Sequence, residues 1–197
     1  ALGQKDLKYV IGYSSVSHMG YVLMGLGTLD VLAVNGAVLQ MFSHGIMTAL
    51  FFAMVGIIYQ RTHSRDITIL EGLGKRMGIT GVFLAVAGLT SLGLPGFSSF
   101  VAELLVFIGT YRTYPILAIL GVIGAAITAV YILRLLGKVF FGPMDETRWR
   151  DLTDATRLET SVAVFLTGFL LLWGLYPFRI VEIIDSGVVP IMERLGS

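Results

Sequence analysis

Cysteine is absent from this chain of 197 residues, only 14% of its residues are charged, and only five are proline. Without cysteine the chain forms neither a disulfide scaffold nor a cysteine-ligated metal or iron–sulfur site. Soluble domains carry about 25% charged residues, so the low charge excludes a soluble enzyme with a charged surface. The net charge of +1 provides no basic excess to neutralise phosphates, which excludes a dedicated nucleic-acid binder. An apolar fraction of 55% excludes a disordered chain.

The chain instead contains long stretches without Asp, Glu, Lys or Arg. A helix that crosses about 30 Å of hydrocarbon needs about 20 residues, and each stretch is long enough. The sequence therefore predicts an all-α membrane protein with a transmembrane domain over residues 1–178. We expect five membrane-spanning helices, near residues 9–28, 36–60, 78–110, 114–141 and 160–177. Residues 179–197 mix apolar and charged side chains, and we expect them to form an external tail at the membrane interface.

Lys and Arg are distributed unevenly over the ends of these helices. Five spans would place the N-terminus, the 61–77 loop and the 142–159 loop on one side. Cytoplasmic loops are enriched in Lys and Arg, so we expect this side to be cytoplasmic and the C-terminus to be external. The chain begins with alanine rather than methionine, and we expect a fragment or a processed product. The ten basic residues on the first side, against three on the other, are Lys5, Lys8, Arg61, Arg65, Lys75, Arg76, Lys138, Arg148, Arg150 and Arg157.

Polar side chains recur at helical spacing on three of the predicted helices. A polar stripe is unfavourable in lipid, so these faces should point towards other helices or water. Their Ser, Thr and Gln residues either hydrogen-bond neighbouring helices, at about 1 kcal/mol each, or line a path for protons. The stripes are Ser14, Ser17, His18 and Tyr21 on the first helix, Gln40, Ser43, His44 and Thr48 on the second, and Thr128, Tyr131, Arg134 and Lys138 on the fourth.

The third predicted helix should be broken. As a straight helix, residues 78–110 would be about 50 Å long, which exceeds the hydrocarbon core. Proline lacks an N–H and clashes with the carbonyl four residues earlier, and glycine makes irregular backbone less unfavourable. We expect Ser98 or Ser99 to cap the restarting helix. A plain proline kink is the alternative. The break is predicted at Gly93, Pro95 and Gly96.

Glu103 follows the break, about two turns from the outer end of its span. A charge at the membrane centre costs about 2.5–3.5 kcal/mol on insertion scales, so a buried ionisable residue is a functional candidate. Both forms of imidazole are accessible near pH 7, which suits His18 and His44 to passing protons. We expect these three residues to share a cavity as a proton relay, in a ladder that leads outward. The expected further relay members or buried partners are Arg134, Ser14, Ser17, Gln40 and Ser43.

Several segments, in order along the chain, resemble the antiporter-like membrane subunits of respiratory complex I. The carboxylate at Glu103 is typical of the subunit M (chain 4) family of NADH-quinone oxidoreductase, whereas the L and N subunits usually carry lysine there. The similar segments are YSSVSHMG at 13–20, GAVLQMFSHG at 36–45, RTHSRD at 61–66 and SLGLPGF at 91–97.

This resemblance implies the C-terminal part of a fourteen-helix antiporter-like fold that transports protons and performs no redox chemistry of its own. It assigns His18 and His44 to a central hydrophilic axis and Glu103 to its terminal carboxylate; the family's upstream Glu and Lys relay residues would precede Ala1. NADH, flavin, iron–sulfur clusters and quinone would bind to other subunits, and no cofactor or metal to this chain. Its partners would be L and N type subunits and lipid. The expected location is the bacterial plasma membrane, with the inner mitochondrial or thylakoid membrane as alternatives.

Other functions stay open at this point. A cation/proton antiporter subunit and a membrane subunit of an energy-converting hydrogenase share these motifs. A structural membrane scaffold is the alternative without transport. It predicts that Glu103, His18 and His44 tolerate apolar replacement.

Overall fold

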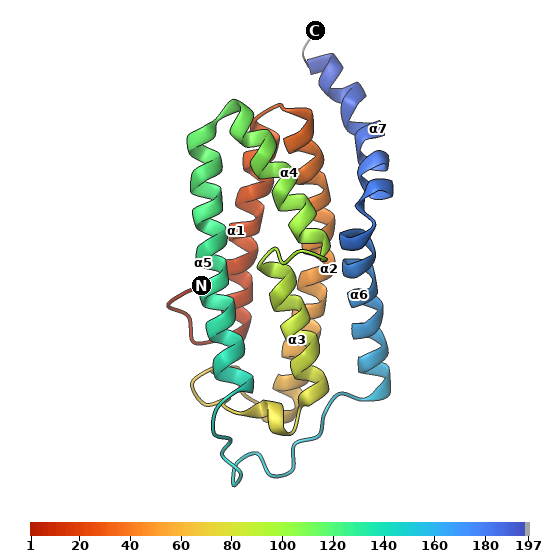
Figure 1. Cartoon of the computed structure of the whole chain (residues 1–197). Helices are drawn as coiled ribbons and strands as arrows, with labels where there is room; N and C mark the ends of the chain where they lie inside the picture. Colours follow the sequence, from red (N-terminus) through yellow and green to blue (C-terminus); the bar gives the residue numbers. More distant parts are fainter. Residues whose placement is uncertain (196–197) are drawn as a thin grey trace.

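The computed structural model describes residues 1–195, and every regular element in this range is a helix. In Figure 1, α5 lies along one side of the bundle, α3 and α4 follow one another through the middle, and α6 and α7 follow one another along the opposite side. The predicted all-α fold is confirmed. The elements are α1 (Leu7–Gly27), α2 (Val31–Thr62), η1 (Leu73–Lys75), α3 (Gly78–Ser91), α4 (Ser98–Thr113), α5 (Pro115–Phe140), α6 (Arg157–Leu175) and α7 (Pro177–Leu195).

Side-chain caps fix the starts of several helices. Asp6 accepts hydrogen bonds from two backbone N–H groups of α1, and Asp30 accepts one from Ala33 in α2. α6 begins with a capping box, in which Thr156 and Glu159 each accept a hydrogen bond from the other's backbone N–H. These contacts satisfy N–H groups that the first turn of a helix leaves free.

α2 is the central helix, since it contacts α1, α3, α4, α6 and α7. Its close packing against α4 depends on Gly36, because a Cβ there would lie 2.6 Å from the backbone N of Val106 and 2.8 Å from the carbonyl O of Ala102. α2 carries four of the buried polar residues of the bundle, Asn35, Gln40, Ser43 and His44.

The predicted helix break is confirmed, because α3 ends at Ser91 and α4 begins at Ser98. Gly93 has φ +64° and Gly96 has φ +104°, both in the left-handed region that favours glycine. With 14 and 16 residues, α3 and α4 are about 21 and 24 Å long, so neither crosses a membrane alone. Together, at about 45 Å, the pair is longer than the hydrocarbon core of about 30 Å and can cross it.

The predicted fifth span and tail form two successive helices. α7 continues roughly in the direction of α6 (Figure 1). Their junction packs against the α3–α4 break, because a Cβ on Gly174 would collide with the carbonyl O of Gly96. The first turns of α7 then pack on α2 and α4 through Ile180, which clusters with Leu39 and Ala102. The tail is thus helical up to Leu195, and its place at the membrane interface stays a prediction.

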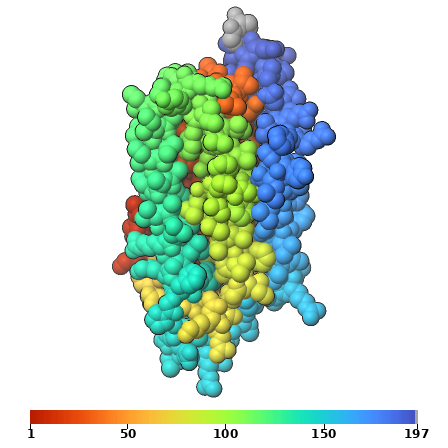
Figure 2. All heavy atoms as spheres, in the orientation of Figure 1, coloured from red at the N-terminus to blue at the C-terminus, as the bar shows by residue number. Residues whose placement is uncertain are grey.

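Three of the described helices are long and apolar enough to cross a membrane by length and composition: α2, α5 and α6. α1 is long enough but too polar along its stripe, and α3 and α4 are short. Figure 2 shows α5, the α3–α4 pair and the α6–α7 pair side by side on one face. α5 exposes an apolar surface that in a soluble protein would mark an interaction site: Ile116, Leu117, Ile119, Leu120, Val122, Ile123, Ile127, Val130 and Leu133.

The loop after α5 is tied to the start of α3 by Asp154. Its carboxylate accepts hydrogen bonds from the backbone N of Ile79 at 2.7 Å, the backbone N of Thr80 at 3.1 Å and the hydroxyl of Thr80 at 2.7 Å. Burial raises the pKa of Asp154, but the hydrogen bonds from Thr80, Ala155 and Ile79 outweigh burial and leave this pKa below its ordinary value.

We expect Asp154→Ala to lower the free energy of unfolding by about 1 kcal/mol, because its carboxylate, like that of an N-cap residue, accepts from N–H groups at the start of a helix. Because the folded-state pKa is depressed, this stability is present above the unfolded-state pKa of about 3.9 and is lost as the pH falls through the folded-state value. Thermal unfolding of the full-length protein at several pH values measures the difference. Asp151→Ala, in the same loop, is the control. If the difference in unfolding free energy between Asp154→Ala and the unchanged protein stayed constant into strong acid, the capping role would be contradicted.

Candidate functional site

A buried polar cluster lies where α1, α2 and α4 meet beside the helix break. The sequence predicted that His18, His44 and Glu103 share a site, and the structure brings the three side chains together. They are 0%, 8% and 5% exposed, respectively. We call this site the polar cluster, and it consists of His18, Gln40, His44, Ser91 and Glu103.

His18 is the centre of the polar cluster. Its Nε2 lies 3.0 Å from the hydroxyl of Ser91. Its Nδ1 lies 3.5 Å from Oε1 of Glu103 and 3.3 Å from Nε2 of Gln40. The ring centroids of His18 and His44 are 5.2 Å apart. One imidazole on α1 therefore contacts polar groups from α2, α3 and α4.

Three atoms of the polar cluster are buried and have no hydrogen-bond partner in the protein. They are Oε1 of Glu103, Oε1 of Gln40 and Nδ1 of His44. Leaving such an atom unsatisfied costs about 1–3 kcal/mol, and buried polar groups of this kind bind internal water. The polar cluster can therefore bind water or exchange a proton at three points. No group of three His, Cys, Asp or Glu side chains suited to a metal ion occurs among residues 1–195.

The helix break holds the carboxylate of Glu103. A Cβ at Gly93 would lie 2.6 Å from Oε2 of Glu103, so the glycine leaves the space that this oxygen fills. The other oxygen, Oε1, faces His18. The break thus positions one side of the carboxylate while the other side faces the imidazole.

The serines that restart the helix do not cap it, so that prediction is wrong. The N-cap residue of α4 is Phe97, with no side-chain cap hydrogen bond. The hydroxyls of Ser98 and Ser99 instead lie 2.6 and 2.9 Å from the hydroxyl of Ser43 on α2. These three hydroxyls join α2 to the break and satisfy one another's need for a hydrogen-bond partner inside the bundle.

The other predicted members of the proton relay differ in how close they lie to the polar cluster. Ser14 lies 3.5 Å from the hydroxyl of Ser91 and so adjoins the polar cluster. Ser17 is half-buried and lies outside the hydrogen bonds that hold the cluster. Arg134 is exposed and donates a hydrogen bond of 2.8 Å to the carbonyl O of Leu2. The structure therefore directs Arg134 to the N-terminal segment rather than to the polar cluster.

The two histidine rings are direct neighbours rather than separate rungs of the expected ladder. That ladder counted residues from the inner helix ends, which are not level. The turn at residues 28–30 joins α1 to α2 and gives both helices a common reference level. His18 lies ten residues before Thr28, and His44 lies fourteen residues after Asp30. The difference of four residues is about 6 Å along a helix, which fits the ring distance of 5.2 Å.

Two residues, Ser91 and Tyr131, were not predicted from the sequence as members of the hydrogen bonds around the histidines. Ser91 contacts His18, and Tyr131 donates a hydrogen bond of 2.8 Å to Ser14. The polar stripe on the fourth predicted helix contained Tyr131, which was the available signal. Ser91 ends α3 directly before the break, where its hydroxyl reaches α1.

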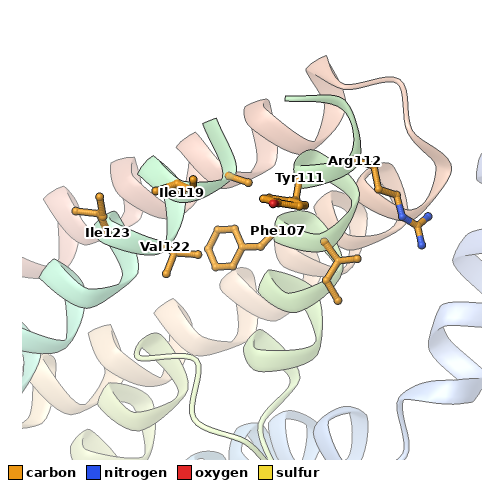
Figure 3. Close-up of a pocket in the computed structure, with 8 residues that line it drawn as sticks. Phe107, Tyr111, Arg112, Ile119, Val122 and Ile123 are labelled. Carbon is orange, nitrogen blue, oxygen red and sulfur yellow. The ribbon is translucent and has the colours of Figure 1, made fainter. Parts of the chain in front are cut away.

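A second hollow lies apart from the polar cluster, between α4 and α5. It has a volume of about 560 Å³ and is lined mainly by apolar side chains, among them Phe107, Ile119 and Val122. Figure 3 shows that Arg112, at its edge, points away from Ile119 and Val122. The polar side chains of this lining are Tyr111 and Arg112, and one hydroxyl group does not make a series that could pass a proton onward, so the hollow adds nothing to the candidate site.

Comparisons with known proteins give consistent matches. Residues 1–128, which contain the whole polar cluster, match the family described as NADH:quinone oxidoreductase/Mrp antiporter, TM. The NAD(P)H-quinone oxidoreductase chain 4 1 of Synechococcus elongatus is 40% identical over 205 aligned positions, which cover 100% of this chain and 38% of the relative. The NADH-quinone oxidoreductase subunit M of Rickettsia prowazekii is 35% identical over 188 positions, covering 95% of this chain and 38% of the relative.

Among solved structures, a chain of respiratory complex I from Thermus thermophilus with bound NADH matches this fold. The TM-score is 0.88 at 25% sequence identity, and the match covers 97% of this chain and 41% of that chain. The present chain thus spans less than half the length of each of these three proteins.

Proposed function

Because this chain belongs to the NADH:quinone oxidoreductase/Mrp antiporter transmembrane family, we propose that it is the C-terminal part of a proton-translocating subunit M of an NADH:quinone oxidoreductase. The observation that carries this proposal is the buried carboxylate of Glu103, held by a helix break and facing His18 at 3.5 Å. The chain takes no part in redox chemistry. NADH, flavin, iron–sulfur clusters and quinone bind to other subunits, and L and N type subunits are its neighbours in the membrane.

His18 and Glu103 can share one proton without any change in their summed charge. The proton lies either on the imidazole, beside an ionised carboxylate, or on a neutral carboxylic acid beside a neutral imidazole. Both forms of the pair avoid an isolated buried charge, which would be far more unfavourable. A modest change in the surrounding charge is therefore enough to move the proton between Nδ1 of His18 and Oε1 of Glu103.

His44 can provide that change in charge. Its ring lies 5.2 Å from the ring of His18, and two positive charges at such a distance inside a protein repel each other strongly. A proton that arrives at His44 therefore disfavours a protonated His18 and drives the His18 proton towards Glu103. Glu103 then releases it towards the predicted external side. These steps move one proton from His18 outward, and the cycle closes when His44 releases its proton and His18 takes up another.

Glu103→Gln in the full-length protein, within its complete complex, tests this function. The amide keeps the shape of the side chain but cannot exchange a proton. We expect proton transport per NADH oxidised in proteoliposomes to fall severalfold, while NADH oxidation with artificial electron acceptors stays unchanged. Glu182→Gln, which alters an exposed carboxylate on α7, is the matched control.

Unchanged proton transport by the Glu103→Gln complex would overturn the proposal and favour a structural scaffold. The family description also includes Mrp antiporters. Proton movement that depends on sodium and needs no NADH, and that the same variant abolishes, would assign the chain to a cation/proton antiporter instead.

A further inference from the structure

Four buried side chains from three helices form one continuous series of hydrogen bonds that ends on His18. The hydroxyl of Tyr131 on α5 donates to the hydroxyl of Ser14 on α1 at 2.8 Å. The hydroxyl of Ser14 lies 3.5 Å from that of Ser91 on α3, which lies 3.0 Å from Nε2 of His18. None of the four residues is more than 5% exposed. We call Tyr131, Ser14 and Ser91 the hydroxyl chain.

The hydrogen atoms of the hydroxyl chain can all point in one direction. Each hydroxyl group has one hydrogen to donate. Since Tyr131 donates to Ser14, the hydrogen of Ser14 is free for Ser91, and that of Ser91 is free for Nε2 of His18. Nε2 is then the acceptor, and Nδ1 carries the N–H that faces Glu103. This form requires the Gln40 amide, whose Nε2 lies 3.3 Å from Nδ1, to turn so that its unpartnered Oε1 accepts from Nδ1 instead. This tautomer is the one that transfer to the carboxylate requires.

Tyr131 is the first member of the series. Its one hydrogen can also be donated to the hydroxyl of Thr128 at 3.2 Å, a longer contact than the one to Ser14, and Thr128 donates its own hydrogen to the carbonyl O of Gly124. Thr128 therefore cannot pass a proton to Tyr131. A lone pair on the phenol oxygen stays available to a donor from outside the series.

That donor can reach Tyr131 from a small cavity under the N-terminal segment. The cavity is lined by Tyr131, Gln4, Leu2 and Arg134 among others, and its volume is about 10 Å³, close to the volume that one water molecule needs. Arg134 is exposed and donates a hydrogen bond to the carbonyl O of Leu2 at the edge of this cavity. In the described chain, this end of the series thus lies next to the surface between α1 and α5.

We propose that the hydroxyl chain is a lateral entry path that delivers protons from this cavity to His18, an inference that rests on the proposed function of the polar cluster. A proton from water in the cavity binds to the phenol oxygen of Tyr131, whose original proton passes to Ser14. The proton of Ser14 passes to Ser91, and that of Ser91 passes to Nε2 of His18. At each oxygen one O–H bond forms and one breaks, and the product is a protonated imidazole.

The protonated His18 then carries hydrogen on both ring nitrogens. Transfer of the Nδ1 proton to Oε1 of Glu103 leaves the hydrogen on Nε2. The starting tautomer returns when internal water takes the Nε2 proton and gives one to Nδ1, a step that changes neither the charge of the ring nor the number of its protons. The three hydroxyls must rotate to accept the next proton. Entry and forward transfer therefore use different nitrogens of the same ring.

Tyr131→Phe in the full-length protein and its complete complex tests the entry path. The change removes one oxygen atom and keeps the ring that packs in the apolar core, so it opens no space for a substituting water. Loss of a positioned proton-transfer group slows a step by about 100-fold or more, and we expect proton transport to fall at least about tenfold. Thr128→Val, which removes a hydroxyl beside the series but outside it, should leave transport unchanged.

A structural role for the Tyr131 hydroxyl would lower the unfolding temperature without this selective loss, so thermal unfolding is measured alongside. Ser91→Ala provides a spectroscopic readout. The ¹⁵N resonances of His18, identified by their loss in His18→Gln, should shift away from the Nδ1–H tautomer when Ser91 no longer donates to Nε2. Normal transport by Tyr131→Phe, or an unchanged His18 tautomer in Ser91→Ala, would overturn the entry path. If Glu103→Gln is inactive in the same assay, the proposed function would still stand; if it is active, the proposed function itself fails.

Discussion

Gly36→Ala is expected to prevent normal packing of α2 against α4. The added Cβ would lie 2.6 Å from the backbone N of Val106 and 2.8 Å from the carbonyl O of Ala102. Overpacking a helix interface costs about 1–3 kcal/mol. Backbone atoms cannot rotate aside as a side chain can, so we expect the upper end of this range, a change of about 100-fold in the folding equilibrium. Since Glu103 follows Ala102, the forced separation would also pull the carboxylate from His18.

Gly45→Ala is the matched control for this variant. Gly45 lies on the same helix, and a Cβ there would meet nothing within 4 Å. Replacing glycine by alanine within a helix stabilises it by roughly 0.5–1 kcal/mol where there is space. The yield of folded full-length protein and its unfolding temperature measure both variants. Equal behaviour of the two variants would show that the α2–α4 contact is not as tight as described.

The second large effect is expected for Gly93→Ala. A residue other than glycine at φ +64° is strained by about 1–2 kcal/mol. In addition, the new Cβ would lie 2.6 Å from Oε2 of Glu103 and force the carboxylate to move. Because proton transfer depends on hydrogen-bond geometry, we expect transport per assembled complex to fall about tenfold or more.

Gly142→Ala separates backbone strain from the effect on the carboxylate. Gly142 has φ +101° in the loop after α5, and a Cβ there would meet nothing within 4 Å. This variant should lose some stability but keep its transport per assembled complex. Full transport by Gly93→Ala, once corrected for the amount of assembled protein, would mean that the break does not position Glu103.

The sequence alone predicted the broken helix and the polar residues beside it, for physical reasons that act locally. Proline and glycine disrupt a helix wherever they occur together, so the break followed from Gly93, Pro95 and Gly96. An ionisable side chain within a long uncharged stretch must find a polar partner. This requirement was enough to associate Glu103 with the two histidines.

The partners across helix interfaces could not be predicted in the same way. A polar stripe indicates which face of a helix is interior, but it contains no information about the residue opposite. The contact of Ser91 with His18 depends on where α3 stops, and the ladder failed because the relative height of α1 and α2 is a tertiary property. Arg134 has a long side chain that can reach several places, and it reaches the N-terminal segment. The continuation of α6 into α7 was likewise hidden by the charges that follow Phe178.

The central claim is that the buried carboxyl group of Glu103 gains and loses a proton during turnover. Infrared difference spectroscopy of the full-length complex, between its resting and NADH-driven states, tests this claim directly, with Glu103→Gln to identify the carboxyl band. The account predicts a band for a protonated carboxylic acid that changes between the two states and is missing from the variant. An unchanged Glu103 signal, whether permanently ionised or permanently protonated, would contradict it.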